Sequence, residues 1–329
     1  MPSKPDFHSL VAIAGPTGGG KAALAMEVAE RSDAILISCD SMKVYRGMDV
    51  GTAKPDRAAR ERCDWRCLDL VWPWQDFDAH RFVVAAEEAM RDAREQARPV
   101  IVSGGTALYL KALTEGLFDG PGADPELRAS LRAEAELGGS AALHERLVEQ
   151  DPAAAAAIHP NDVRRIVRAL EVGALSGAGI SSLQVQFGHL RADRARRLFV
   201  VTRPRESMDE RINLRVDAMF DGGWLDECRH LASSAMALSN GPLQAIGYRE
   251  IFAWLDDPST TSFAELAAGI KTKTRRFARR QLTWLKKFPD AILCEPRQGE
   301  ARDNLVLEIC QAVEKAKQET QAGGPSPAS

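Results

Sequence analysis

Short apolar runs alternate with amphipathic helical patterns along the chain up to about residue 115. Four of these runs predict β-strands: Leu10–Ala14, Ala34–Ser38, Arg66–Val71 and Pro99–Ser103. Helical patterns begin near Lys21, Asp78 and Thr106. Because strands and helices take turns, the pattern predicts a parallel sheet whose strands are joined by crossover helices.

The remainder of the chain is mostly helical in pattern. No β signal occurs between Asp124 and about Ser176, and residues 177–188 form a Gly- and Ser-rich break. A strand is predicted at Arg197–Thr202, helices continue to about Lys287, and a short strand near Ala291–Leu293 precedes a last helix from Asn304. We therefore predict an α/β core (1–123 and 191–316) with a helical C-terminal part, interrupted by an all-helical insertion (124–190). Residues 317–329 are predicted to be a disordered tail.

Composition narrows the class of protein. Hydrophobic residues make up 45% and charged residues 27% of the 329 residues, which is typical of a soluble globular protein. No apolar run approaches the ~20 residues of a membrane helix, and none near the start fits a signal peptide. We expect a cytoplasmic monomer that does not bind membranes. Among the six cysteines only Cys63 and Cys67 lie close together, so free thiols are favoured over a zinc site.

Basic residues concentrate in one segment although the net charge is −3. Residues 271–287 hold eight Lys or Arg residues and no Asp or Glu. Such a run is typical of a solvated helix face or of a surface that binds RNA. Trp284 lies within the run and fits a core position as well as a stacking platform for a base.

The strongest local motif follows the first predicted strand. The segment Gly15-Pro16-Thr17-Gly18-Gly19-Gly20-Lys21-Ala22 contains the spacing G-x4-G-K and leads into a helical pattern. Glycines let backbone N–H groups turn toward an anion, the helix N-terminus adds partial positive charge, and Lys21 adds a full charge. The segment therefore predicts a phosphate-binding loop.

Two residues, one in this loop and one just after the next predicted strand, bear on the reaction that the loop could support. Ala22 stands where such loops usually have the Ser or Thr hydroxyl that binds Mg²⁺, which argues against an ordinary nucleotide hydrolase. Asp40 follows the second predicted strand, at the sheet edge where open α/β folds bind ligands. It fits a metal ligand, a general base or a helix- or turn-capping residue, and its position alone does not choose among them.

Six further segments occur in an order that points to one family. They are Ile37–Pro55, Val102–Gly116, Ile158–Val172, Glu210–Gly223, Gln244–Ile251 and Thr274–Lys287. Together with the phosphate loop, they resemble the tRNA dimethylallyltransferases. The resemblance implies a P-loop kinase-like core. It also implies transfer of a dimethylallyl group from dimethylallyl diphosphate to N6 of the adenosine 3′-adjacent to the anticodon, with Mg²⁺ as cofactor.

The same resemblance implies roles for individual residues. Gly15 to Ala22 would cradle the diphosphate, Lys21 and Arg215 would neutralise it as it leaves, Asp40 would be the general base and Thr106 would lie at the target adenine. The tRNA contacts implied are Asp40, Ser41, Met42, Lys43, Thr106, Arg128, Arg164, Arg165, Arg168, Gln244, Gly247, Tyr248, Arg249, Arg279, Arg280 and Gln281. The helical insertion would belong to the tRNA-binding surface.

Four positions depart from the family pattern: Ala22, Lys43 in place of Gln, Trp65-Arg66 in place of a His pair, and Ala107 in place of a frequent Gly. Rival hypotheses are an adenylate isopentenyltransferase, a non-catalytic tRNA-binding relative and a nucleoside kinase. The insertion and the basic segments favour tRNA over a free nucleotide. The presence of Asp40 and Thr106 favours an enzyme.

Overall fold

The computed structural model describes residues 7–118, 120–184 and 189–323. The chain divides into two compact units: the larger combines residues up to Thr114 with those from Leu190, and the smaller is Glu115–His189. The smaller unit thus begins before residue 124. The reason is that Phe118 packs against its hydrophobic core, and the carbonyl of Pro121 accepts a hydrogen bond from Arg168.

The larger unit is built on a six-stranded parallel sheet, so the predicted α/β core is confirmed. The strands, in the order β3-β2-β4-β1-β5-β6, are β3 (Trp65–Arg66), β2 (Ile35–Cys39), β4 (Val100–Gly104), β1 (His8–Ala14), β5 (Arg194–Val201) and β6 (Ala291–Cys294). Strands β1, β2 and β4 are buried along their whole length, as expected for a sheet covered on both faces. Because all strands are parallel, their carboxyl ends meet at one edge.

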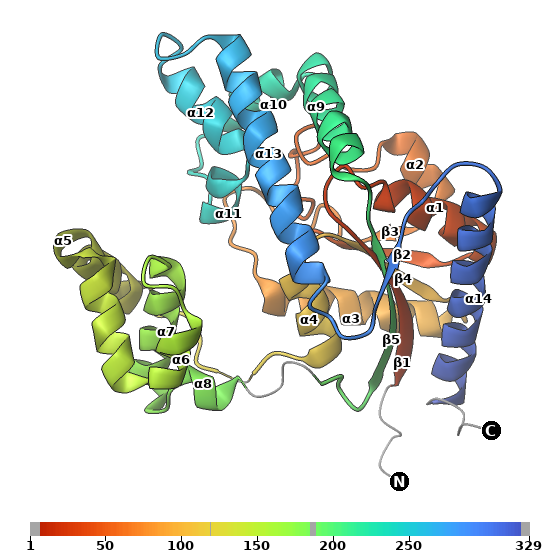
Figure 1. Cartoon of the computed structure of the whole chain (residues 1–329), viewed down its shortest axis with the longest axis horizontal. Helices are drawn as coiled ribbons and strands as arrows, with labels where there is room; N and C mark the ends of the chain where they lie inside the picture. Colours follow the sequence, from red (N-terminus) through yellow and green to blue (C-terminus); the bar gives the residue numbers. More distant parts are fainter. Residues whose placement is uncertain (1–6, 119, 185–188, 324–329) are drawn as a thin grey trace. The chain divides into compact units, whose positions relative to one another are not determined.

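Helices cover both faces of this sheet (Figure 1). Helices α1 (Lys21–Ser32) and α14 (Glu300–Ala322) pack on one face through Leu24, Val28, Ile309 and similar apolar residues. Helices α3 (Ala79–Glu95) and α4 (Ala107–Glu115) pack on the other face, joined by Leu285 at the end of the long helix α13 (Phe263–Leu285). A short helix, α2 (Arg57–Arg62), precedes β3.

A second helical layer follows β5 in the chain. It comprises α9 (Arg205–Asp221), α10 (Trp224–Ala232), α11 (Asn240–Gln244), α12 (Tyr248–Asp256) and α13 (Phe263–Leu285). Helices α9, α10, α12 and α13 share a core around Trp224 with Val44, Tyr45 and Met48 from the segment after β2. In Figure 1 the long helix α13 runs beside α9. No helix in the described residues is long and apolar enough to cross a bilayer.

The smaller unit contains helices only within its described residues: α5 (Pro125–Gln150), α6 (Pro152–Ala157), α7 (Val163–Ser176) and α8 (Ile180–Leu183). Helix α5 bends at Gly139, whose backbone leaves helical geometry with φ 82° and ψ 158°. Leu143, Leu147, Ile166 and Leu170 form its core.

Two sequence predictions are wrong in part. The strand predicted at Arg66–Val71 stops at Arg66, because Cys67 and Asp69 adopt left-handed backbone conformations with φ 60° and 54°. The carboxylate of Asp69 is held there by Lys54 and Arg60.

The disordered tail predicted from residue 317 is also partly wrong, because α14 continues to Ala322. Glu319 accepts hydrogen bonds from Ser9 and Arg197, and Thr320 bonds the backbone of Ser9, which fixes this end of the helix to the sheet. Residues 324–329 of the predicted tail lie outside the described residues.

Candidate functional site

The phosphate loop connects β1 to α1 at the carboxyl edge of the sheet. Gly18 and Gly20 have φ of 79° and 93°, a conformation that glycine adopts without strain. Gly20 is the N-cap of α1, so no side chain occupies the first-turn amide groups of that helix. The loop therefore offers a helix N-terminus to an anion, as the sequence predicts.

Two arginines that the sequence analysis missed hold the loop from outside. Arg203 Nε donates to the carbonyl of Gly19 and Arg211 Nε donates to the carbonyl of Gly18, both at 2.9 Å. Anchoring these carbonyls fixes the orientation of the neighbouring peptide groups. Arg211 lies one helical turn before Arg215 in α9, and this spacing was the available signal for its role.

Gln281, predicted as a tRNA contact, also supports the loop. Its side-chain oxygen accepts a hydrogen bond from the backbone N–H of Thr17 at 2.9 Å, and its amide nitrogen donates to the carbonyl of Gly105 at 3.0 Å. One side chain from α13 thus ties the phosphate loop to the loop after β4.

Three cations surround one carboxylate at this edge. Burial, together with the positive charges of Lys43 and Arg215, lowers the pKa of Lys21 to about 7, while Asp40 acts in the opposite direction. Burial also lowers the pKa of Lys43 and of Arg215, and in both cases Asp40 opposes the shift. The Nε of Arg215 is buried without a hydrogen-bond partner in the described residues. The cluster carries more positive than negative charge in a poorly solvated place, which favours binding of a multiply charged anion.

Asp40 lies beside this cluster, and Thr106 bonds the residues on either side of Asp40. One oxygen of Asp40 accepts hydrogen bonds from the backbone N–H of Met42 at 2.9 Å and of Lys43 at 3.4 Å, which closes a turn. The hydroxyl of Thr106 accepts a bond from the N–H of Ser41 at 3.1 Å. The structure therefore places Asp40 among the cations Lys21, Lys43 and Arg215, with Thr106 bonded to Ser41, the residue after Asp40.

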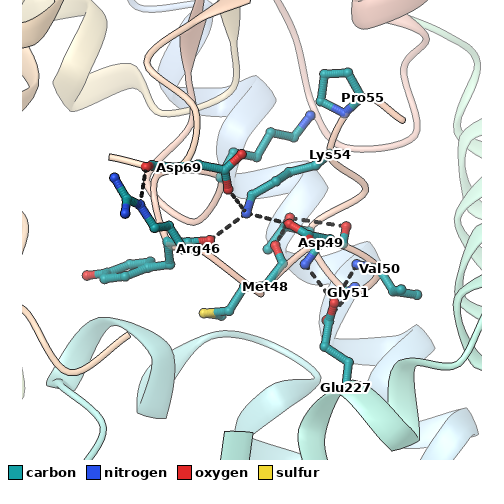
Figure 2. A network of polar contacts seen from close by, with 12 residues as sticks. Arg46, Met48, Asp49, Val50, Gly51, Lys54, Pro55, Asp69 and Glu227 are labelled. Carbon is teal, nitrogen blue, oxygen red and sulfur yellow. Dashed lines mark hydrogen bonds and ion pairs between the residues drawn. The ribbon is translucent and has the colours of Figure 1, made fainter. Parts of the chain in front are cut away.

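The segment after Asp40 is fixed by an ionic network (Figure 2). Lys54, whose side chain is only 1% exposed, donates to Asp49 and Asp69 at 2.6 Å and to the carbonyl of Tyr45. Figure 2 also shows Glu227 of α10 accepting bonds from three successive backbone N–H groups, those of Asp49, Val50 and Gly51.

Trp224, also on α10, packs between two segments that carry predicted site residues. A Cβ atom added to Gly51 or to Gly247 would lie about 2 Å from its ring, so both positions require glycine. Tyr248 is buried, and its hydroxyl donates to Glu227 at 2.6 Å. Gly247 and Tyr248 thus have a structural role, whereas Gln244 and Arg249 in the same segment are exposed.

Helix α13 presents cations to solvent. Arg279 and Arg280 are exposed; Arg279 lies 3.4 Å from Asp209, and Arg280 lies over the ring of Phe277. Trp284 is 41% exposed with Lys287 over its ring, so it is a surface residue rather than a core residue.

In the smaller unit, two residues predicted to contact tRNA form ion pairs within the protein. Arg128 and Arg168 both pair with the fully buried Glu171, at 2.8 and 2.7 Å. Burial disfavours the charged form of Glu171, but the hydrogen bonds from the two arginines outweigh it and lower the pKa. Arg164 and Arg165 on the same helix are exposed, with Arg165 3.4 Å from Asp162.

Asp40 is the residue whose chemistry suits a metal ligand: it is the carboxylate at the edge of the sheet beside the phosphate loop. The described residues contain no group of three or more His, Cys, Asp or Glu side chains that could hold an ion. Ala22 contributes no hydroxyl, and Asp40 is surrounded by cations. All six cysteines are free thiols.

The chain is similar to one family of known proteins. The sequence profile of the IPP transferase family matches residues 43–288. A tRNA dimethylallyltransferase of Anaeromyxobacter dehalogenans is 45% identical over 291 residues, covering 87% of this chain and 95% of that protein. One from Geobacter metallireducens is 42% identical over 288 residues, covering 87% and 92%.

Solved structures give the same result. The full-length tRNA isopentenylpyrophosphate transferase of Bacillus halodurans matches with a TM-score of 0.68 and 32% identity, covering 96% of this chain and 98% of that chain. A eukaryotic dimethylallyltransferase acting on tRNA matches with a TM-score of 0.73 and 26% identity, covering 98% of this chain and 81% of that chain.

Proposed function

The chain belongs to the IPP transferase family, and we propose that it is a tRNA dimethylallyltransferase. In this proposal it transfers a dimethylallyl group from dimethylallyl diphosphate to N6 of the adenosine 3′-adjacent to the anticodon. One observation carries the proposal. Asp40 lies among the cations Lys21, Lys43 and Arg215 beside the phosphate loop, and Thr106 bonds Ser41, the residue after Asp40.

The reaction suits these residue types. The exocyclic amine attacks the allylic carbon, a C–N bond forms, and the C–O bond to the diphosphate breaks with its electron pair. Positive charge develops on N6 and negative charge on the leaving oxygen. Asp40 accepts the proton from N6, while loop amides, Lys21 and Arg215 stabilise the diphosphate. Thr106, bonded to the turn that carries Asp40, helps position the base.

The target adenine leaves its stack before reaction, because N6 must approach a donor bound inside the sheet edge. Extruding a base from a single-stranded loop costs less than from a duplex. The proposed tRNA contacts are the exposed cations on α13, the exposed Gln244 and Arg249, and Arg164 and Arg165 of the smaller unit.

The described residues hold no three-ligand cluster and residue 22 lacks a hydroxyl, but Mg²⁺ that binds with a substrate diphosphate needs only one or two protein carboxylates, and Asp40 would be the one beside the phosphate loop. Lys21, Lys43 and Arg215 would neutralise the charge of the diphosphate, and no step of the mechanism is routed through a metal.

Nucleoside analysis by mass spectrometry tests the proposal. Purified protein is incubated with dimethylallyl diphosphate and either unmodified tRNA or AMP. Prenylated adenosine from tRNA, at the position next to the anticodon, is the expected product. Product from AMP alone would favour an adenylate isopentenyltransferase. Absence of product from either acceptor at every donor concentration would favour a non-catalytic tRNA-binding relative.

A further inference from the structure

An exposed aromatic stack lies beside the segment that carries Asp40. Trp72 and Trp74 stack with ring centroids 5.1 Å apart and an interplanar angle of 4°. The guanidinium of Arg46 lies over the ring of Trp72, 5.2 Å from its centroid. Trp72 is 44% exposed. We call Arg46, Trp72 and Trp74 the Trp72 platform.

The platform is held in a defined conformation. The side chain of Gln75 accepts a hydrogen bond from the N–H of Trp72 at 2.8 Å, and the N–H of Gln75 donates to the carbonyl of Trp72 at 2.9 Å. Arg46 Nε donates to the carbonyl of Asp69 at 2.8 Å (Figure 2). Because the loop backbone and Arg46 are fixed in this way and the two rings pack on each other, the platform loses little conformational entropy when a ligand stacks on it.

Backbone bonds connect the platform to two segments of the proposed tRNA surface. Arg46 N donates to the carbonyl of Val71 just before Trp72, and Arg46 lies three residues after Lys43. The backbone N–H of Ser239 donates to the carbonyl of Pro73, between the two tryptophans, at 2.8 Å. Ser239 precedes α11, which ends at the exposed Gln244. The platform is therefore continuous with both segments.

We propose that the Trp72 platform receives an unpaired base of the tRNA anticodon arm by stacking. Aromatic rings and guanidinium planes are the groups on which proteins stack splayed-out RNA bases. The platform combines both, and an Arg beside it suits the polyanion. This inference rests on the proposed function, since it assumes that tRNA is the acceptor.

Acidic residues beside the Trp72 platform determine which part of an RNA it can contact. Asp76 and Asp78 follow in the same loop and are exposed, although Asp78 caps α3 and the carbonyl of Asp76 is bonded by Arg81. This surface is therefore poorly suited to follow a phosphate backbone. The contribution of the platform, whose central ring is Trp72, is stacking on a base and depends little on salt.

Binding of a fluorescent anticodon stem-loop tests the proposal, with prenylation of full tRNA measured in parallel. Trp72→Ala is expected to weaken RNA binding by about 5- to 20-fold, and Trp72→Phe should retain most of the affinity. The slope of log affinity against log salt should not change, because no cation is removed. Leu307→Ala, which removes an exposed apolar side chain from α14, is the matched control and should bind normally.

Abasic substitutions through the anticodon loop identify the partner base. One abasic RNA should bind the unaltered protein more weakly by a similar factor, and Trp72→Ala should then weaken binding no further. Normal RNA binding by Trp72→Ala overturns the inference, as does an equal reduction with every abasic RNA. A change in sedimentation without a change in RNA binding also overturns it and assigns the platform to a protein contact. If the unaltered protein prenylates no tRNA, the proposed function fails instead.

Discussion

Lys21 shows at the scale of one residue how the site is prepared for a multiply charged anion. Its amino group is buried among Lys43 and Arg215, and its pKa falls to about 7. Near pH 7 the free protein therefore holds a mixture of charged and neutral Lys21. A bound diphosphate favours the charged form, so binding and proton uptake are coupled.

Pyrophosphate binding should therefore weaken as the pH rises above 7. Above that pH the free protein loses the Lys21 proton and must regain it on binding, which costs up to about tenfold in affinity per pH unit. Titration calorimetry between pH 7 and 9, in buffers of different ionisation enthalpy, measures both affinity and proton uptake. Lys21→Arg keeps its charge throughout this range and should show a flatter profile. Ionisation of the ligand is common to both proteins, so identical profiles would contradict the role of Lys21.

Asp40 is the residue on which the proton transfer depends. Asp40→Asn keeps the shape and can still accept the backbone bonds from Met42 and Lys43, but it cannot take a proton from N6. Single-turnover prenylation should fall by ~10²–10⁴-fold while tRNA affinity changes little. Rapid-quench kinetics with saturating tRNA and donor measure this step. A near-normal rate would remove Asp40 from the mechanism.

The geometry of the phosphate loop could be predicted from the sequence because its glycines and Lys21 lie in one short segment with a recognisable local pattern, whereas the roles of Asp40 and Thr106 stay predictions that rest on the family resemblance. Arg203 and Arg211 could not be predicted in the same way. Each bonds a loop carbonyl from a distant part of the chain, and only the tertiary structure brings them there.

At the scale of elements, α10 supports the site although it carries no predicted site residue. Its Glu227 bonds the backbone of Asp49 to Gly51 and the hydroxyl of Tyr248, while its Trp224 packs against Gly51 and Gly247. The helix thus holds together the segment that follows Asp40 and the segment that contains Gln244 and Arg249. Glu227 is a positioning residue in this arrangement.

Glu227→Gln should lower kcat for prenyl transfer by roughly tenfold or more, because a neutral amide holds three N–H groups more weakly than a carboxylate. The KM for dimethylallyl diphosphate should stay nearly unchanged, since the phosphate loop is not touched. Asp226→Asn is the matched control: it makes the same chemical change one residue earlier, where Asp226 is exposed and pairs with Arg229. A parallel decrease of kcat and donor affinity, or an equal effect of Asp226→Asn, would assign Glu227 to general stability.

The bounds of two elements could not be predicted from the pattern of apolar and polar residues alone. Residues 66–71 have the apolar content of a strand, but ion pairs of Asp69 with Lys54 and Arg60 fix a turn there. Residues 317–322 have the polar composition of a tail, yet bonds of Glu319 and Thr320 to β1 and β5 keep them helical. In both segments, tertiary contacts of charged groups determine the backbone conformation.

Arg128 and Arg164 separate fold stability from RNA binding within the smaller unit. Arg128→Ala should lower the free energy of unfolding by roughly 1–3 kcal/mol, because buried Glu171 loses one of its two arginine partners. Arg164→Ala should leave stability unchanged and weaken tRNA binding. Urea unfolding and filter binding measure the two quantities. The destabilisation in Arg128→Ala should shrink as the pH falls through the lowered pKa of Glu171, since a protonated carboxyl needs no arginine. Equal stability of both variants would contradict this division.

For the whole molecule, exposed cations matter more than net charge. The total is −3, yet residues 271–287 contribute eight positive side chains, and several of them face solvent on α13. Net charge alone therefore does not predict RNA binding, and the prediction rests on the concentration of basic residues along α13. Whether such a helix binds RNA is a question about released counterions, which a salt titration answers.

Replacing Arg279 and Arg280 with Ala should weaken tRNA binding and flatten the slope of log affinity against log salt by up to about two, one for each phosphate that is no longer neutralised. Arg280 should contribute more than Arg279, because Arg279 already shares its charge with Asp209 at 3.4 Å, whereas Arg280 lies over Phe277. Pyrophosphate affinity should not change, because the phosphate loop is held by Arg203, Arg211 and Gln281 instead. Fluorescence anisotropy with unmodified tRNA at several salt concentrations measures the slope for each single variant and for the pair. If the double variant keeps the slope of the unaltered protein, this face of α13 is merely solvated, and tRNA is held by the other exposed cations.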